Sequence, residues 1–101
     1  MEGDAVPIAR AEDTDTAANA VVATAVSRKR TVMAQVNAEG FVVGVRVLDD
    51  VVRHWDVATL DERVKAVASV AHDRYLAGLD VPDGSYPTME AVADAEMELD
   101  F

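Results

Sequence analysis

Apolar and polar positions alternate most clearly between Thr31 and Leu48, and this pattern predicts two strands joined by a tight turn. The second strand divides its residues between two faces, with Phe41, Val43, Val45 and Val47 on one and Val42, Gly44, Arg46 and Leu48 on the other. The segment from Asn37 to Gly40 has turn chemistry. An asparagine side chain can accept from the backbone two residues on, and glycine can close a turn at positive φ. The sequence therefore predicts a β-hairpin.

A third strand is expected before this hairpin. The segment Ala20 to Ser27 mixes alanine, which favours helix, with valine and threonine, which favour strand. The hairpin that follows favours a strand for this segment, because a three-stranded meander is more stable than a two-stranded ribbon. Ser27 to Arg30 then forms the connection.

Helical spacing of apolar residues begins after Trp55. One apolar stripe is formed by Leu60, Val64, Val67, Ala68, Ala71 and Tyr75. Two positions are possible for the start of this helix. Thr59 and Glu62 fit a capping box, and Asp56, about one turn earlier, is the alternative N-cap. Gly78 is expected to end the helix in the left-handed conformation.

The connection before this helix runs from Asp49 to Trp55. Its apolar residues are expected to pack under the helix, and Trp55 is interpreted as a lid on the core. His54 is expected to face solvent, because no catalytic partner is close to it in sequence.

The segment after Asp80 reads as a loop, and Thr88 is predicted to cap a short acidic helix. Two roles are open for this helix: a lid docked on its own domain, or a tail that binds a partner. The candidate partner-binding residues are Met89, Val92, Met97, Leu99 and Phe101.

The pattern as a whole predicts an α+β fold, in which a three-stranded antiparallel meander is followed by a packed helix and a short C-terminal helix or tail. Residues 1–17 are acidic without an apolar period and are predicted to be a disordered arm. Residues 18–79 form the predicted α+β domain, and residues 80–101 form the loop and acidic tail.

The composition of the chain limits the classes of function that it can have. The chain has 19 acidic and 9 basic residues and a formal net charge of −10, which weighs against binding to phosphate backbones. Arg28, Lys29 and Arg30 nevertheless form a possible basic patch. The absence of cysteine excludes thiolate catalysis and cysteine-based zinc sites, and it fits a cytoplasmic location. The sequence assigns no catalytic, cofactor-binding or metal-binding residue, and it contains no apolar run long enough for a membrane span.

The strands carry apolar residues on both faces, whereas one helix covers only one face. We therefore expect a homodimer in which a second copy covers the remaining face. The residues assigned to this dimer face are Val22, Val32, Val36, Val42 and Leu48.

The run from about Ala23 to Leu79 resembles the YbaB/EbfC family of small bacterial proteins. The resemblance rests on Val36 to Gly40 turning into Val42 to Val47, then an Asp-bearing connection, then Leu60 opening an Ala/Val-rich helix. It implies a homodimer. Family members are described as nucleoid-associated DNA binders, and actinobacterial relatives accompany type VII (ESX) secretion systems.

The acidic charge favours the secretion-associated branch over the DNA-binding one. The sequence therefore predicts a non-enzymatic homodimer that binds another protein, as an adaptor or chaperone-like factor of the type VII pathway. The alternative is a nucleoid-associated DNA-binding protein that uses Arg28, Lys29 and Arg30.

Overall fold

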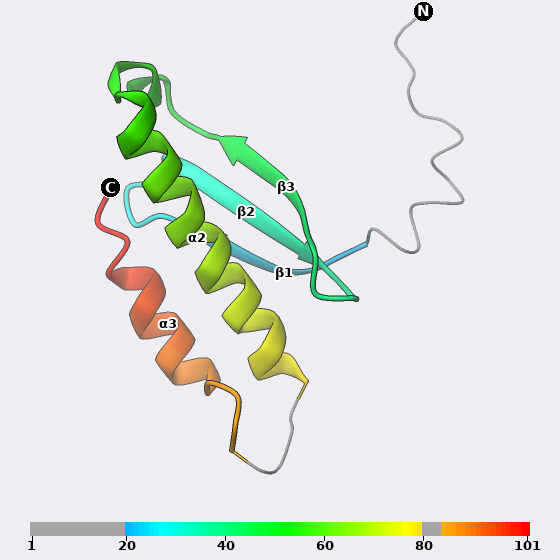
Figure 1. The fold of residues 1–101 in the computed structure, drawn as a ribbon. Coiled ribbons are helices and arrows are strands. Elements are labelled where there is room, and N and C mark those ends of the chain that lie inside the picture. The colour runs from blue at the N-terminus through cyan, green and yellow to red at the C-terminus, as the bar shows by residue number, and fades with distance from the viewer. Residues whose placement is uncertain (1–19, 80–83) are drawn as a thin grey trace, which may run out of the picture.

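The computed structural model describes residues 20–79 and 84–101, which form a three-stranded antiparallel sheet, a long helix and a short helix (Figure 1). The elements in chain order are β1 (Val21–Val26), β2 (Val32–Asn37), β3 (Val42–Val47), the 3-10 helix η2 (Asp50–His54), α2 (Val57–Gly78) and α3 (Met89–Met97). The α+β prediction is confirmed. The predicted acidic arm, residues 1–17, lies outside the described residues.

The β2–β3 turn forms as its sequence predicts. The Asn37 side-chain oxygen accepts from the backbone N–H of Glu39 at 3.0 Å and of Phe41 at 2.9 Å. Gly40 closes the turn at φ 88°, a conformation that glycine adopts at low cost.

Helix α2 begins one turn earlier than the capping box would place it. The Asp56 carboxylate accepts from the Thr59 backbone N–H at 2.7 Å, so Asp56 is the N-cap. The predicted left-handed stop at Gly78 is wrong. Gly78 is still helical, and Leu79 follows in right-handed conformation with its N–H bonded to Leu76 O.

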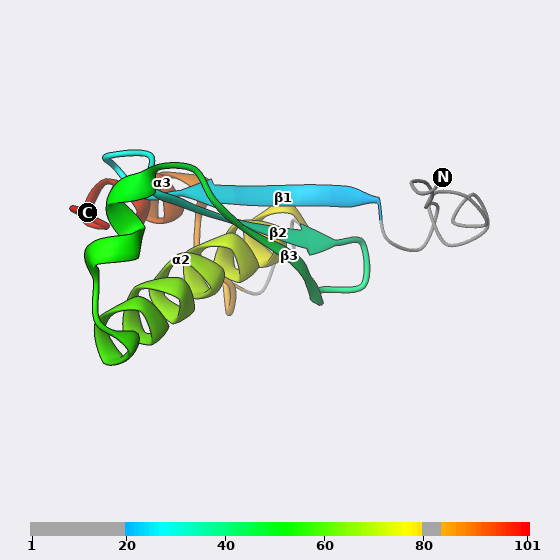
Figure 2. The ribbon, with the colours of Figure 1, turned by 90° about the horizontal axis from the view of Figure 1, so that it is seen from above.

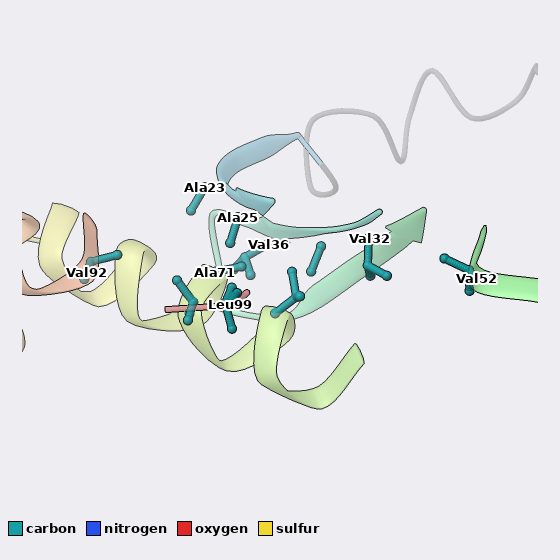
Figure 3. Packing of buried hydrophobic residues seen from close by; sticks show 11 residues of the cluster. Ala23, Ala25, Val32, Val36, Val52, Ala71, Val92 and Leu99 are labelled. Atoms are coloured by element: carbon teal, nitrogen blue, oxygen red, sulfur yellow. The ribbon is translucent and has the colours of Figure 1, made fainter. Parts of the chain in front are cut away.

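The core lies between α2 and one face of the sheet (Figures 2 and 3). Small residues on the facing surfaces let the helix approach the sheet closely, and larger ones fill the remaining space. The predicted stripe is confirmed in Val67 and Ala71, which are buried, and its other members pack at the margin; Val70 joins the core in addition. The buried apolar residues are Ala23, Ala25, Val32, Ala34, Val36, Val52, Val67, Val70, Ala71, Val92 and Leu99.

Helix α3 lies beside α2 at the β1 side of the sheet (Figure 1). The Thr88 hydroxyl caps it as predicted, accepting from Ala91 N–H at 3.0 Å. Beyond α3, Leu99 O and Phe101 O accept from the backbone N–H groups of Arg28 and Lys29 at 2.7 and 3.1 Å. The C-terminal segment is therefore docked on its own domain.

This docking corrects part of the predicted partner-binding tail. Val92 and Leu99 are buried in the core, and Phe101 is partly buried against it. They are held there because α3 and the residues after it supply apolar surface that α2 and the sheet would otherwise leave exposed. Met89 and Met97 remain exposed.

The predicted dimer face also needs correction. Val32 and Val36 are fully buried in the core instead of lying on an outer face. The reason is register: Val36 pairs with Ala23, and residues paired across strands share a face of the sheet. Val22, Val42 and Leu48 are exposed.

Candidate interaction surface on the open edge of the sheet

The two edges of the sheet differ. Along β1 two of the outward backbone groups are occupied by side chains: Val26 N–H donates to the Glu96 carboxylate at 2.9 Å, and Thr24 O accepts from the Arg74 guanidinium. Arg74 and Glu96 also pair with each other through two hydrogen bonds, at 3.0 and 3.1 Å. These two side chains bond where a neighbouring strand would pair with Thr24 and Val26, and they obstruct the β1 edge there.

The charge of Glu96 is stabilised by this arrangement. The hydrogen bond from Arg74 lowers the pKa of the Glu96 carboxyl below its ordinary value, and the Val26 N–H acts in the same direction against partial burial. The carboxylate is therefore ionised at neutral pH and accepts at both oxygens.

The β3 edge is open. Leu48 N–H donates to Thr31 O at 2.8 Å, which fixes the orientation of the strand relative to β2. Val43 is the extra residue of a bulge in β3, between the pairs Gln35–Gly44 and Val36–Val42. From Gly44 to Leu48 the ladder is regular and inward and outward backbone groups alternate, so Val45 and Val47 direct their N–H and C=O groups away from β2. Within the part of the chain that the structure describes, no hydrogen bond occupies these outward groups.

The side chains of these three valines form an apolar row, which we call the β3 strip. Val45 pairs with Ala34 and Val47 with Val32, so both lie on the face of the sheet that carries α2. Helix α2 packs mainly on β1 and β2 and leaves β3 beside it (Figure 1). Val43, Val45 and Val47 are consequently 40, 44 and 56% exposed. An exposed apolar row beside an unpaired strand edge is a surface suited to protein binding.

A second exposed apolar row lies on α3. Met89, Ala93 and Met97 follow at four-residue spacing, which places them on one side of the helix, and all three are exposed. Glu90 and Asp94 adjoin the row and are exposed too. This face combines flexible methionines with negative charge, a combination that suits a basic amphipathic segment.

A cavity of about 370 Å³ lies near the C-terminal end of α2. Its lining includes Val22 from β1, Tyr75 and Leu79 from the end of α2, and Met89 from α3. Val22, one of the residues assigned to the dimer face, therefore borders a cavity instead of a flat sheet face. It is the extra residue of a bulge in β1, between the pairs Val21–Asn37 and Ala23–Val36.

The predicted basic residues Arg28, Lys29 and Arg30 come together as an exposed turn between β1 and β2. Carboxylates adjoin it on both sides: Glu96 lines a shallow cavity with Arg28 and Arg30, and Asp100 lines another with Lys29. The positive potential at the turn is weakened by these neighbours.

Trp55 packs against the core at its margin, as its interpretation as a lid requires. Its ring meets Phe101 edge to face, with 5.9 Å between centroids, and the Arg63 guanidinium carbon lies 4.4 Å from its centroid. Trp55 thus anchors the docked C-terminal segment. His54 is exposed, as predicted.

Among residues 20–79 and 84–101, no three histidine or acidic side chains gather in a way that could hold a metal ion, and no helix there is long and apolar enough to cross a membrane. Comparison with protein-family models, with curated proteins and with solved structures gives no match. Inferences about function therefore rest on the fold and on the exposed surfaces.

The Arg74–Glu96 pair was not anticipated from the sequence, although a signal for it exists. Glu96 lies four residues after Val92 and three before Leu99, inside the buried side of α3, and Arg74 follows Ala71 by three in the same way on α2. A charged residue within an apolar stripe indicates a buried or half-buried polar partner. Two such residues of opposite sign predict an ion pair.

Proposed function

We propose that the protein is a non-enzymatic, homodimeric adaptor or chaperone-like factor that binds another protein. The observation that carries this proposal is the β3 strip beside its unpaired strand edge, because both apolar side chains and free backbone groups there are available to a partner. In this proposal, a second copy of the chain binds at the β3 edge.

The α3 face of Met89, Ala93 and Met97 is the proposed site for the other protein. Glu90 and Asp94 beside it favour a segment with basic residues around apolar ones. The resemblance to the secretion-associated branch of the YbaB/EbfC family supports a cytoplasmic role linked to type VII secretion.

The first test is the molar mass in solution. Light scattering on the full chain at tens of micromolar is expected to give twice the chain mass of 10.8 kDa. A mass equal to one chain throughout this range would contradict the homodimer.

The second test concerns the α3 face. A photo-reactive amino acid at position 93 is used to trap the partner in native cells, and the purified partner is then titrated against two variants. Met97→Asp is expected to weaken binding about tenfold or more, because it places a charge in an apolar contact.

The matched control is Val57→Asp, which puts the same charge at an exposed apolar position of α2. It is expected to leave the affinity unchanged. Equal loss in both variants, or no loss in either, would contradict the assignment of the α3 face.

The alternative function is DNA binding through Arg28, Lys29 and Arg30. The observation in its favour is that all three side chains are exposed on one turn. Their acidic neighbours and the negative charge of the chain weigh against it, and a titration described below distinguishes the two functions.

A further inference from the structure

We infer that two copies of the chain join through β3 in one register, with Val45 of one protomer opposite Val45 of its partner, to form a continuous six-stranded sheet. This inference rests on the proposed homodimer and specifies how it is built. It begins from the difference between the sheet edges: Arg74 and Glu96 occupy β1, whereas the outward groups of β3 are unpaired in the described structure.

A strand that pairs with its own copy across a two-fold axis must be antiparallel to it. Outward-facing residues must also stand opposite outward-facing residues, because only these have N–H and C=O groups pointing at the partner. Val45 and Val47 are the outward-facing residues of the regular part of β3, which begins at Gly44 after the bulge, so only a few registers are possible.

Charge and side-chain size select among these registers. If Arg46 lay on the axis, it would face its own copy, and like charges directly opposite are unfavourable. If Gly44 lay on the axis, two residues without side chains would meet at the centre of the contact and Arg46 would face Val42. If Val47 lay on the axis, the pairing would run past the end of β3 and the acidic Asp49 would face Val45. With Val45 on the axis, Val45 faces its copy and Arg46 faces Gly44, so the pairing uses the regular part of the strand.

The last arrangement also gives Arg46 a partner. The space above Gly44 is occupied by the Gln35 side chain, whose oxygen lies 2.6 Å from the position that a Cβ on Gly44 would take. An arginine from the opposite strand that crosses Gly44 meets this amide oxygen, which can accept a hydrogen bond from a guanidinium. Gln35, which lies over Gly44, therefore presents its amide oxygen to the Arg46 side chain of the second copy.

The register also joins the two β3 strips. Val45 and Val47 lie on the α2 face of the sheet, because they pair with the buried Ala34 and Val32, so the four valines of a dimer form one apolar surface between the two α2 helices. This explains why the valines of an edge strand are exposed on the face that carries the helix. An isolated chain covers only part of that face.

The chain has no cysteine, so single cysteines report the register directly. Residues opposite each other in a hydrogen-bonded antiparallel pair have Cα atoms about 5.5 Å apart, which a disulfide can span. Val45→Cys is therefore expected to give a disulfide-linked dimer on mild oxidation. Val47→Cys alone is not, because each Val47 lies roughly 13 Å from its own copy in this register.

A second variant tests the same edge without oxidation. Val45→Lys is expected to raise the dimer dissociation constant tenfold or more, because lysine on an edge strand blocks pairing, whereas Val57→Lys is expected to leave it unchanged. Circular dichroism establishes that each variant is folded.

The outcomes separate the inference from the proposed function. If light scattering shows a dimer but Val45→Cys does not cross-link and Val45→Lys remains dimeric, the β3 register is wrong and the homodimer stands. Cross-linking of Val47→Cys alone as efficiently as Val45→Cys would also overturn the register. A monomeric wild-type chain would overturn both.

Discussion

Gly40 and Gly78 show how differently two glycines can be constrained. Gly40 adopts φ 88°, and a Cβ there would lie 2.9 Å from Cε2 of Tyr75. Gly78 lies in α2, and a Cβ there would meet nothing within 4 Å. Position 40 therefore requires glycine because of its positive φ and because of the contact with Tyr75. Position 78 has neither constraint.

Gly40→Ala is expected to reduce the free energy of unfolding by at least about 1 kcal/mol, because alanine is strained at positive φ and its methyl group would displace Tyr75. Gly78 is the last residue of α2, and Gly78→Ala is expected to increase it by up to about 0.5 kcal/mol, since alanine restricts the unfolded chain and its methyl group meets nothing there. Urea unfolding of both variants measures the two changes. Equal effects of the two substitutions would contradict this account of the turn.

At Glu96 the charge matters as well as the shape. The pKa of the carboxyl is lowered in the folded protein from its ordinary value of 4.5, so folding is stabilised by its ionised form above that pH. The stabilisation is lost as pH falls through the folded pKa, where the carboxyl becomes protonated in both states.

Glu96→Gln keeps an oxygen that can accept from Val26 but removes the charge opposite Arg74. We expect it to lower the free energy of unfolding by about 1 to 2 kcal/mol at pH 7, with a difference from wild type that shrinks towards pH 3. Glu98→Gln is the control, because Glu98 is exposed. A difference that stays constant between pH 7 and pH 3 would show that the charge of Glu96 is not involved.

Among the elements, α3 belongs to the core more than its acidic sequence indicates. Val92 is buried, and the segment after the helix places Leu99 in the same cluster. Hydrogen bonds from the β1–β2 turn to Leu99 and Phe101 hold the backbone of this segment in place.

Leu99→Ala is therefore expected to lower the free energy of unfolding by about 2 to 4 kcal/mol, since it leaves a cavity in the core. Met97→Ala, two residues away and exposed, is expected to change it by less than about 0.5 kcal/mol. Chemical denaturation compares the two variants. Similar small effects from both would mean that the C-terminal segment contributes little to folding.

The elements themselves were predictable from sequence because strong local signals define them. Asn37 and Gly40 specify the turn, Asp56 and Thr88 accept from the first turns of α2 and α3, and the apolar period of α2 identifies its buried side.

The pairing between elements was not predictable in the same way. Both faces of β1 and β2 carry apolar residues, so alternation alone does not say whether Val32 and Val36 face the helix or the opposite side. The docking of the C-terminal segment depends on backbone hydrogen bonds from Arg28 to Leu99 and from Lys29 to Phe101, which no side-chain pattern encodes.

At the scale of the whole molecule, charge separates the two candidate functions. The chain carries a net charge of −10, and its exposed basic turn adjoins Glu96 and Asp100. A surface of this kind gains little from the release of counterions on binding DNA.

Titration with duplex DNA at about 0.15 M salt is expected to show no binding tighter than the nonspecific range of roughly 10⁻⁴ to 10⁻⁶ M. The control is a variant with Arg28, Lys29 and Arg30 replaced by alanine, which is expected to behave like wild type in this assay. Nanomolar, salt-dependent binding that this variant loses would favour the DNA-binding function instead.

The occupied β1 edge also determines how far such a sheet can grow. In polymer chemistry a monomer with one reactive end gives only pairs, and one with two reactive ends gives chains. In the proposed homodimer Arg74 and Glu96 obstruct the second edge, so edge pairing is expected to stop at two copies. The ion pair thus acts as a chain terminator: without it each copy would be bifunctional, and the same pairing that makes a closed dimer could extend into a fibre.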